Sequence, residues 1–460
     1  DGLNAAAIMW ETLFDLGADV MPYVPHRTTE GYGLSNPAIT KLAAEGVKLI
    51  ITVDHGVTAT KQVEHAKAHG VDVIITDHHV LPQKPPKSYA LVHTTKLCGA
   101  GVSWILAYEI VKKIKPSYEK TLMEKLELAA IATVADLVPL TGGSRAIVTL
   151  GLEYLSNSLR PGIAALLLES GISPPITTYE IGHVIAPRIN AMGRIEHGMY
   201  ALRLLCAKNQ KQAADLAKIL GKTNSKRKEM TQKAVGEAFS MVIESTHVGV
   251  ITSSNWHEGV IGLVASRLVE THNKPMILIA QGDVYSKGSA RSIPGFNIVE
   301  AIRASSQFLV DAGGHPMAAG FTIETKKIQN FTKDINKYAK KKLTEDILTP
   351  ILNIECELSK EEITPEILST IKKFEPFGVA NPEPIFITKK MLIEDSRTVG
   401  VENRHLKLVL DGIDAIAFNL GERTSEVRPG KLIDVVYTIS NNYYNGNNSL
   451  QLKIKDFHTV

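Results

Sequence analysis

Short apolar runs alternate with stretches of helical character in the N-terminal part of the chain. Residues 47–53 and 71–76 are short apolar runs rich in β-branched residues, and residues 89–92 form a shorter apolar run. Such runs are typical of strands that are buried on both faces of a parallel sheet. Residues 58–69 have helical character, and Gly70 follows them where a helix C-terminus favours glycine. The pattern therefore predicts an α/β domain built on a parallel sheet.

The middle of the chain is predicted to be helical and then to return to an α/β pattern. Residues 101–170 are mostly helical in character, and residues 200–240 read as one long polar helix. That helix carries nine Lys and Arg against three Asp and Glu, so its charged face is either a solvated connector or a nucleic-acid contact. Apolar runs at 248–252 and 276–280 begin a second α/β region, which ends after a basic helix at 326–342.

The last part of the chain changes to a strand-rich pattern. Five short segments with strand character follow one another closely, and five such strands suit a small Greek-key barrel such as an OB-fold. The segments are 385–394, 404–410, 415–419, 432–440 and 449–456.

The composition excludes several classes of protein. A chain of 460 residues is too long for one small core and is expected to form two or three domains. No apolar run approaches the roughly 18 residues that a membrane helix needs, so we expect no membrane partner. The three cysteines form no C-x-x-C pair, which excludes a thiolate zinc site and suits a reducing cytoplasm. The net charge is only +3, so a nucleic-acid partner must be argued from local charge.

Ionisable side chains follow both of the first two predicted strands. Asp54 and His55 come after the first strand, and Asp77, His78 and His79 come after the second. Ligands of parallel α/β sheets bind outside the carboxyl ends of the strands, where these two clusters would face each other. Carboxylates with one imidazole are ligands that Mn²⁺ and Mg²⁺ accept. The arrangement predicts a divalent-metal site.

The same residues also have ordinary structural interpretations. Asp54 alone would commonly be a turn or N-cap residue, although the Asp-His-His run is harder to explain in that way. Asp136 is a lone acid in the apolar stretch 132–140, and a buried carboxylate needs a partner, either a metal or an arginine. The residues by themselves favour a metal-dependent hydrolase.

The order of these motifs resembles that of the DHH phosphoesterase superfamily. The motifs are Asp1-Gly2, Val53-Asp54-His55-Gly56, Thr76-Asp77-His78-His79 and Ala135-Asp136, and residues 313–320 resemble the glycine-rich motif of the accompanying DHHA1 domain. Further stretches narrow the resemblance to the RecJ single-strand DNA exonucleases, over essentially the whole chain. They are residues 25–27 with 30–33, 187–190 with 193–194, 256–262, 289–292, and 374–378 with 381–384.

One departure concerns the first motif. The family carries two aspartates there, as D-x-D-G, and this chain has only the second, Asp1. We therefore expect the chain to be a fragment whose upstream part supplies the other aspartate and its strand.

The resemblance implies hydrolysis of single-stranded DNA from its 5′ end to mononucleotides, in DNA repair and recombination, with two Mn²⁺ or Mg²⁺ ions. The metal ligands it implies are Asp1, Asp54, His78 and Asp136, with Asp54 as the bridge. Asp77 would hydrogen-bond a neighbouring ligand, and His79 would contact the scissile phosphate or the leaving oxygen, which makes Asp77, His78 and His79 the expected catalytic group.

The resemblance also implies a set of substrate-binding residues. Serine and arginine side chains would hold a terminal phosphate, and the glycines would let the backbone approach a phosphodiester. Without the resemblance, the arginines read as surface salt-bridge residues, His257 as a helix cap or core residue, and the glycines as a tight turn. The set is Arg27, Arg188, Asn190, Arg194, His257, Ser289, Arg291, Gly313, Gly314 and His315.

The expected organisation follows from the motifs and the patterns together. It comprises a DHH domain at 1–150, a helical connector at 151–243, a DHHA1 domain at 244–345 and an OB-like nucleic-acid-binding barrel at 346–460. Single-stranded DNA is the expected partner of a monomer, with a single-strand-binding protein and a helicase as further candidates. The alternatives are a DHH oligonucleotidase or nucleotide phosphatase, and a non-catalytic replication scaffold of the same fold.

Overall fold

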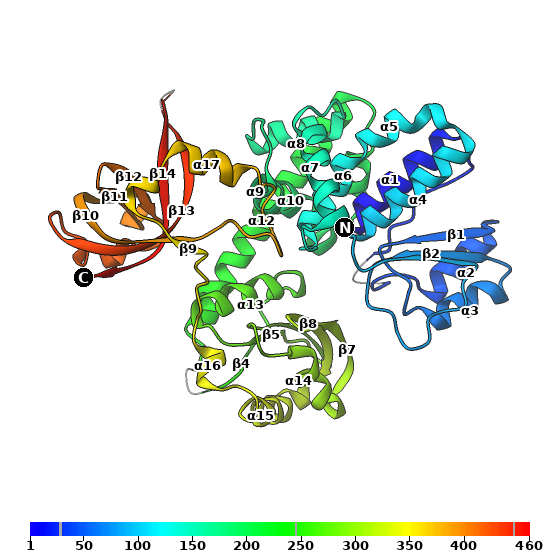
Figure 1. Ribbon diagram of the computed structural model, residues 1–460. Coiled ribbons are helices and arrows are strands. Elements are labelled where there is room, and N and C mark those ends of the chain that lie inside the picture. Colours follow the sequence, from blue (N-terminus) through cyan, green and yellow to red (C-terminus); the bar gives the residue numbers. More distant parts are fainter. Residues whose placement is uncertain (27–29, 244–245, 445–446) are drawn as a thin grey trace.

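The computed structural model describes residues 1–26, 30–243, 246–444 and 447–460. Figure 1 shows two sheet domains, a helical region beside the first of them, and a C-terminal barrel. Among the described residues, no helix is long and apolar enough to cross a membrane.

The first domain contains the predicted parallel sheet. Its strands lie in the order β1-β2-β3, and Val53 at the end of β1 pairs with Thr76 near the end of β2. Both strands therefore finish at the same edge. Helices α2 and α3 cover one face and α1 and α4 the other (Figure 1). The elements are α1 (Gly2–Asp15), α2 (Asn36–Ala44), β1 (Leu49–Val53), α3 (Thr60–Ala68), β2 (Asp72–Asp77), β3 (Ala90–His93) and α4 (Gly99–Ile114).

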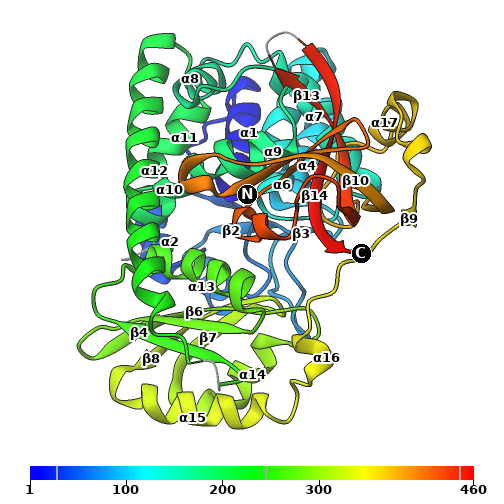
Figure 2. The same ribbon diagram turned by 90° about the vertical axis from the view of Figure 1, so that its left-hand side faces the viewer.

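The helical region follows α4 and ends in a long connecting helix. Figure 2 shows α12 running along one side of the molecule, from α8 to β4. The prediction of one helix over 200–240 is wrong in one respect, because this segment forms two helices, α11 and α12, separated by residues 206–209. The side chain of Asn209 caps α12 by accepting from the Gln212 N–H at 2.8 Å. The elements are η1 (Pro116–Tyr118), α5 (Glu119–Glu124), α6 (Leu126–Ala135), α7 (Gly142–Ser156), α8 (Pro161–Ser170), α9 (Thr178–Glu180), η2 (Ile181–Ile185), α10 (Ala186–Ile195), α11 (Met199–Leu205) and α12 (Gln210–Phe239).

The second sheet domain is mixed, with strand order β4-β5-β6-β8-β7. Its glycine-rich motif, residues 313–320, forms the turn end of the β7–β8 hairpin and pairs along both strands, and β7 is an exposed edge strand. The elements are β4 (Gly249–Ser253), α13 (Glu258–His272), β5 (Met276–Ala280), β6 (Tyr285–Arg291), α14 (Ile298–Ala304), η3 (Ser306–Phe308), β7 (Leu309–His315), β8 (Ala318–Glu324), η4 (Thr325–Lys327), α15 (Ile328–Ala339) and α16 (Glu345–Leu348).

The C-terminal strands form the predicted barrel. Strands β11, β12, β14, β13 and β10 pair in that order, and the pairing of β10 with β11 closes the barrel. The predicted fold class is thereby confirmed. The elements are β9 (Cys356–Glu357), η5 (Lys360–Glu362), α17 (Pro365–Lys372), β10 (Phe386–Val399), η6 (Val401–Asn403), β11 (His405–Leu410), β12 (Ile413–Ala417), η7 (Gly421–Ser425), β13 (Leu432–Tyr444) and β14 (Asn447–Thr459).

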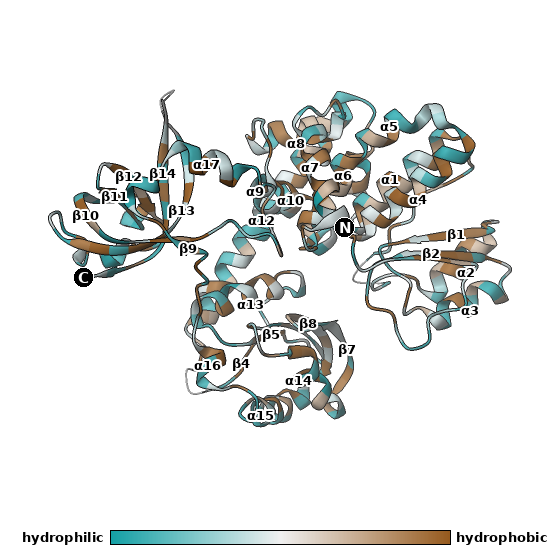
Figure 3. Cartoon of the chain, viewed as in Figure 1, coloured by the Kyte–Doolittle hydropathy of each residue, from teal (hydrophilic) through white to brown (hydrophobic). Residues whose placement is uncertain are grey.

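Separate apolar cores hold these parts together. One core joins α1, α4, α6 and the helices up to α12, a second lies inside the barrel, and others fill the two sheet domains. Figure 3 accordingly shows hydrophobic and hydrophilic positions on the same helices of the N-terminal half. Such amphipathic helices bury one face each.

Candidate metal centre and substrate site

One imidazole lies among three carboxylates at the carboxyl edge of the first sheet. The Nε2 atom of His78 lies 3.0 Å from Asp54 Oδ1, 3.5 Å from Asp1 Oδ2 and 3.5 Å from Asp136 Oδ2. These side chains come from the start of α1, the ends of β1 and β2, and the C-cap of α6. The structure therefore brings together all four side chains that were predicted as metal ligands.

Asp54 occupies a turn that its neighbours fix from two sides. Its φ of 65° lies in the left-handed region, which aspartate tolerates better than most residues. The N–H of Asp54 donates to the carbonyl of Thr76 at 3.0 Å, and the hydroxyl of Tyr32 donates to the carbonyl of Asp54 at 3.0 Å. A backbone held in this sparsely populated conformation is a common property of functional residues.

Two buried atoms of the cluster, Asp54 Oδ1 and His78 Nε2, lie 3.0 Å apart, yet neither has a partner with hydrogen-bond geometry in the described part of the chain. Buried polar atoms are normally hydrogen-bonded, so an orphaned pair calls for an explanation. Two overlapping sets, Asp54 with His78 and His79, and Asp1 with His78 and Asp136, each place their ligand atoms within 4.8 Å of one another. Oxygen ligands with an imidazole nitrogen fit Mn²⁺ or Mg²⁺. The residues present therefore fit a divalent-metal centre.

The N-terminus of α4 holds the carboxylate of Asp1. The N–H groups of Gly99 and Ala100 donate to the two oxygens of Asp1 at 2.6 and 2.7 Å. Backbone N–H groups at a helix start are unsatisfied within the helix and favour a negative charge. The interaction orients Asp1 towards His78.

Asp77 is buried and orients the two histidines that follow it. Its Oδ1 accepts from the His78 N–H and from His79 Nδ1, both at 2.7 Å, and its Oδ2 accepts from the Val57 N–H at 2.9 Å. Burial alone would raise the pKa of Asp77, but the hydrogen bonds from His79 and Val57 outweigh it and hold that pKa well below its usual range. The bond to Asp77 also raises the pKa of His79, against the effect of burial. Asp77 is thus an ionised anchor for the His79 ring.

Asp136 is the most open of the four candidate ligands. Its side chain is 39% exposed, against 10% for Asp54 and 3% for Asp1. Partial burial raises the pKa of Asp136, the proximity of His78 lowers it, and the Asp54 carboxylate raises it again. Among the described residues its carboxylate has one close partner, His78.

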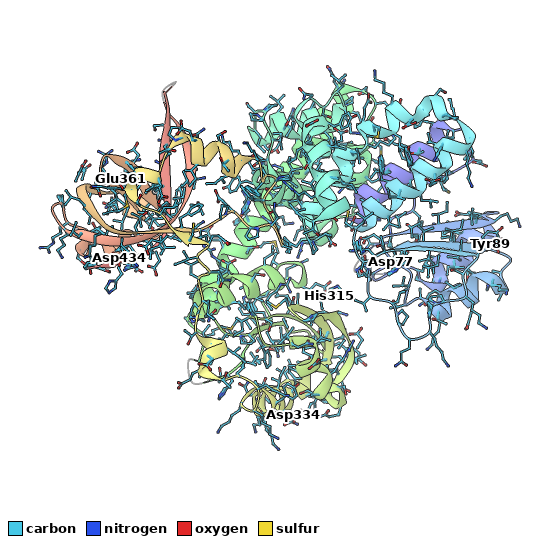
Figure 4. The ribbon with its side chains drawn as sticks, in the orientation of Figure 1. Asp77, Tyr89, His315, Asp334, Glu361 and Asp434 are labelled. Atoms are coloured by element: carbon cyan, nitrogen blue, oxygen red, sulfur yellow. The ribbon has the colours of Figure 1, made fainter. Side chains whose placement is uncertain are left out.

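A histidine of the second sheet domain reaches this cluster. The rings of His79 and His315 stack with centroids 5.9 Å apart and planes inclined by 20°. Figure 4 shows Asp77 and His315 on facing edges of the two domains. Gly313 and Gly314, just before His315 on the edge strand β7, are exposed. The glycine-rich motif therefore lies beside the metal cluster.

Four further candidate residues gather around the first turn of α13. His257 is the N-cap of α13 and accepts from the Gly259 N–H at 3.0 Å, and Arg194 donates to the Gly259 carbonyl at 3.2 Å. Ser289 and Arg291 on β6 face the same helix one turn later, and Arg291 donates to the Ser289 hydroxyl at 3.3 Å. Burial lowers the pKa of Arg291, which has no carboxylate partner among the described residues. The helix cap that was one of the interpretations of His257 is present.

The remaining candidates stand apart from that group. Arg188 forms an ion pair with Glu169 at 2.8 Å and donates to the carbonyl of Val184 at 3.0 Å, which is the salt-bridge alternative for this arginine. Asn190 lies on α10, between Arg188 and Arg194. Arg27 lies outside the described residues.

Gly99 is a residue of the site that sequence reasoning missed. A Cβ on Gly99 would lie 2.5 Å from the Cβ of Asp54 and 2.7 Å from its Oδ1. Only a glycine allows α4 and Asp54 to approach each other so closely. The run of small residues at 99–101, at the start of a helix, was the available signal.

Gly99→Ala should therefore weaken Mn²⁺ binding by about ten-fold or more, as is usual when the support of a metal ligand is disturbed. Gly236→Ala is the matched control, because a Cβ on Gly236 of α12 meets nothing within 4 Å. Calorimetric titration of both variants with Mn²⁺ measures the effect. Equal affinities in the two variants would contradict the role assigned to Gly99.

Three family models match the chain in succession. The DHH family N-terminal domain matches residues 1–134, the DHHA1 domain matches residues 244–341, and the RecJ OB domain matches residues 354–456.

Full-length relatives and solved structures agree with these matches. A single-stranded-DNA-specific exonuclease RecJ of Bacillus subtilis is 36% identical over 99% of this chain and 60% of that protein, and its namesake in Salmonella typhimurium is 32% identical over 99% and 85%. The crystal structure of RecJ in complex with Mn²⁺ from Thermus thermophilus superposes with a TM-score of 0.88 at 30% identity, covering 99% of this chain and 67% of that one. The chain thus spans about three fifths of the Bacillus subtilis relative.

Proposed function

Since this chain belongs to the RecJ family, we propose that it is a metal-dependent exonuclease that hydrolyses single-stranded DNA from the 5′ end to mononucleotides. One observation carries the proposal: His78 and three carboxylates converge at one sheet edge, with two buried atoms left without hydrogen bonds. A polar cluster of this kind needs cations, and phosphodiester hydrolysis is chemistry that paired cations serve.

We assign the holding of the ions to Asp1, Asp54, His78 and Asp136. When bound, divalent ions supply an activated water and neutralise charge on the phosphoryl oxygens. A crystal structure of the Thermus relative with Mg²⁺ accompanies the one with Mn²⁺, which supports either ion here. The remaining chemistry rests on the chain's own side chains.

His79 is the side chain best placed to act on the reacting phosphate. Asp77 accepts from its Nδ1 at 2.7 Å, which fixes the ring and leaves Nε2 as the nitrogen that can meet a substrate. The ring of His315 lies against it, so a phosphodiester between the two domains would meet imidazoles from both. Gly313 and Gly314 beside His315 are exposed on β7, and their lack of side chains lets a phosphodiester approach the backbone closely.

The first turn of α13 is a suitable site for the terminal phosphate. Arg291 and Arg194 both lie at this turn, and Arg291 has no carboxylate partner among the described residues. The start of a helix also favours an anion. Ser289 adds a hydroxyl donor 3.3 Å from the Arg291 guanidinium. We infer that this group recognises the 5′ end, with Arg27 as a further candidate, whereas Arg188 stabilises α10 against α8.

Arg291→Ala should erase most of the preference for a 5′-phosphorylated strand over a 5′-hydroxyl strand. Loss of a charge-assisted hydrogen bond costs about 1.5–3 kcal/mol, or roughly ten- to a hundred-fold in rate. Arg303→Ala is the control, because Arg303 is an exposed arginine of the same domain. Initial rates on the two substrates give the ratio. If the parent protein degraded the 5′-phosphorylated and the 5′-hydroxyl strands at equal rates, the proposal that this group recognises the 5′ phosphate would be refuted.

The barrel favours a long strand over a small substrate. An OB-like barrel offers a groove for single-stranded nucleic acid, which a nucleotide phosphatase or oligonucleotidase would not need. The presence of Asp54, His78 and Asp136 side by side opposes a purely structural scaffold. We further propose that the protein acts as a monomer and cooperates with a single-strand-binding protein and a helicase.

The experiment that tests the function compares three substrates. A long 5′-labelled single strand, the matching duplex and a dinucleotide are incubated with the protein and Mn²⁺. The proposal expects mononucleotides from the single strand and little product from the duplex. Faster hydrolysis of the dinucleotide than of the single strand would favour the oligonucleotidase instead, and no Mn²⁺-dependent product would favour the scaffold.

A further inference from the structure

The loop that precedes the barrel is hydrogen-bonded to the helical region next to Asp136. We call residues 373–381, between α17 and β10, the docking loop. Arg145 on α7 donates to the carbonyls of Lys373 at 3.3 Å and Glu375 at 3.0 Å, and Thr178 on α9 donates to the carbonyl of Phe377 at 2.9 Å. The loop is therefore fastened to two helices of the catalytic half.

The innermost contact of the docking loop is with Leu140. The Leu140 N–H donates to the carbonyl of Val379 at 2.7 Å, and a Cβ on Gly378 would come within 2.7 Å of the Leu140 side chain. Leu140 is 2% exposed and packs with Ala130 and Val134 of α6, the helix that Asp136 caps. Only residues 137–139 separate Leu140 from Asp136.

Asp136 depends on such support more than the other candidate ligands do. Asp1 is held by two backbone N–H groups and Asp54 by its turn, but the Asp136 carboxylate has one close partner among the described residues and is 39% exposed. The next residue, Leu137, has a φ of 57° and is largely exposed, so it adds little packing of its own. The buried Val138 donates its N–H to the carbonyl of Thr133 at 3.2 Å, and Leu140 donates its N–H to the docking loop, so the segment is tied to α6 at its near end and to the loop at its far end.

The docking loop is rigid enough to act as such an anchor. The Asn381 side chain donates to the carbonyls of Phe374 and Pro376, both at 2.9 Å, and the backbones of Gly378 and Asn381 pair with each other. Phe377 packs against the core of the barrel while its carbonyl accepts from Thr178. The loop thereby connects the barrel core to the segment that carries Asp136.

We propose that the docking loop positions Asp136 and so sets the metal affinity and the turnover rate of the centre. The inference rests on the proposed role of Asp136 as a metal ligand. A support lying outside the ligand itself typically changes metal affinity or activity by about 10–100-fold. DNA affinity is predicted to stay unchanged, since these contacts face the protein.

The test uses substitutions in the whole 460-residue chain, because removal of the C-terminal part would take away the loop and the barrel together. The double variant Arg145→Ala/Thr178→Ala removes the three side-chain bonds to the loop, and Gly378→Val displaces Leu140 directly. Thr149→Ala is the control, because the hydroxyl of Thr149 donates to the Arg145 carbonyl within α7 and does not touch the loop. Calorimetric Mn²⁺ titration without DNA, kcat and KM on a short strand, and circular dichroism are measured for each.

We expect the double variant and Gly378→Val to bind Mn²⁺ roughly ten-fold more weakly and to lose kcat by a similar factor at an unchanged KM. Folded variants with parental Mn²⁺ affinity and kcat would overturn the inference, and so would a change in KM alone. If Gly378→Val does not fold, the double variant decides. Asp136→Ala in the same titration distinguishes the ligand role of Asp136 from the positioning role of the docking loop. Unchanged Mn²⁺ affinity in Asp136→Ala would contradict the ligand assignment. Weaker Mn²⁺ binding in Asp136→Ala together with parental affinity in the loop variants would contradict only the role of the docking loop.

Discussion

Asp54→Asn should abolish Mn²⁺-dependent release of nucleotides while leaving single-strand binding largely intact. Asn tolerates the left-handed backbone that Asp54 adopts at a φ of 65°, so this variant removes the negative charge without straining the turn. His78→Ala and Asp136→Ala should behave in the same way, because each removes another candidate ligand of the same centre. The His78 Nε2 atom lies 3.0 Å from Asp54 Oδ1 and 3.5 Å from Asp136 Oδ2. Since disturbing the support of a ligand already costs about 10–100-fold, we expect a loss of more than about a hundred-fold.

Most of the affinity for DNA should survive these changes, since backbone contacts elsewhere supply it. Asp72→Ala is the matched control: Asp72 lies on the same strand, β2, at the opposite end from Asp77, and is exposed. Acid-soluble nucleotide release and filter binding are measured in parallel. Near-normal turnover of any of the three variants at saturating Mn²⁺ would refute the metal assignment.

The sequence was sufficient to predict the sheet edge that carries the metal cluster. The strands ending at Val53 and Asp77 are apolar runs followed at once by Asp and His, and parallel strands bring such ends together by geometry alone. The closed barrel was also predictable, because five short strands leave few other arrangements.

Contacts between distant segments could not be predicted in this way. The role of Gly99 depends on the packing of α4 against the Asp54 turn. The proposed role of the docking loop depends on the hydrogen bond from the Leu140 N–H to the Val379 carbonyl. The β7–β8 hairpin was not predicted because glycines favour turns. Here Gly313 and Gly314 instead pair with β8 along the edge strand β7. In each case tertiary packing decides, and one sequence carries no direct record of it.

A second large effect is expected far from the catalytic edge, at a buried charge network in the helical region. Glu11 of α1 is 3% exposed, and its carboxylate contacts Lys125 at 2.7 Å and Arg160 at 2.9 Å. Arg160 also pairs with Glu127 at 2.6 Å and donates to the Leu205 carbonyl at 2.8 Å. The network therefore joins α1, α6, α8 and α11.

Glu11→Ala should lower the free energy of unfolding by about 3–5 kcal/mol, because it leaves Lys125 and part of Arg160 buried without their counter-charge. Glu109→Ala, at an exposed position of α4, should change it by less than about 0.5 kcal/mol. Urea denaturation followed by circular dichroism at pH 7 gives both values. A Glu11→Ala variant as stable as the Glu109→Ala control would show that the network does not stabilise the fold.

The same network should make part of the stability depend on pH at the acid end. Burial by itself raises the pKa of Glu11, but Arg160 and Lys125 outweigh it and lower that pKa from 4.5 to about 2. Because the folded value lies below the unfolded one, the contribution is complete above pH 4.5 and is lost as the pH falls towards 2. Glu127 titrates in the opposite sense, since burial raises its pKa, so the parental curve alone does not isolate Glu11. The quantity to measure is the stability difference between the parent and Glu11→Gln, which should shrink steadily from pH 5 to pH 2.5. A difference that stays constant over this range would contradict the lowered pKa of Glu11.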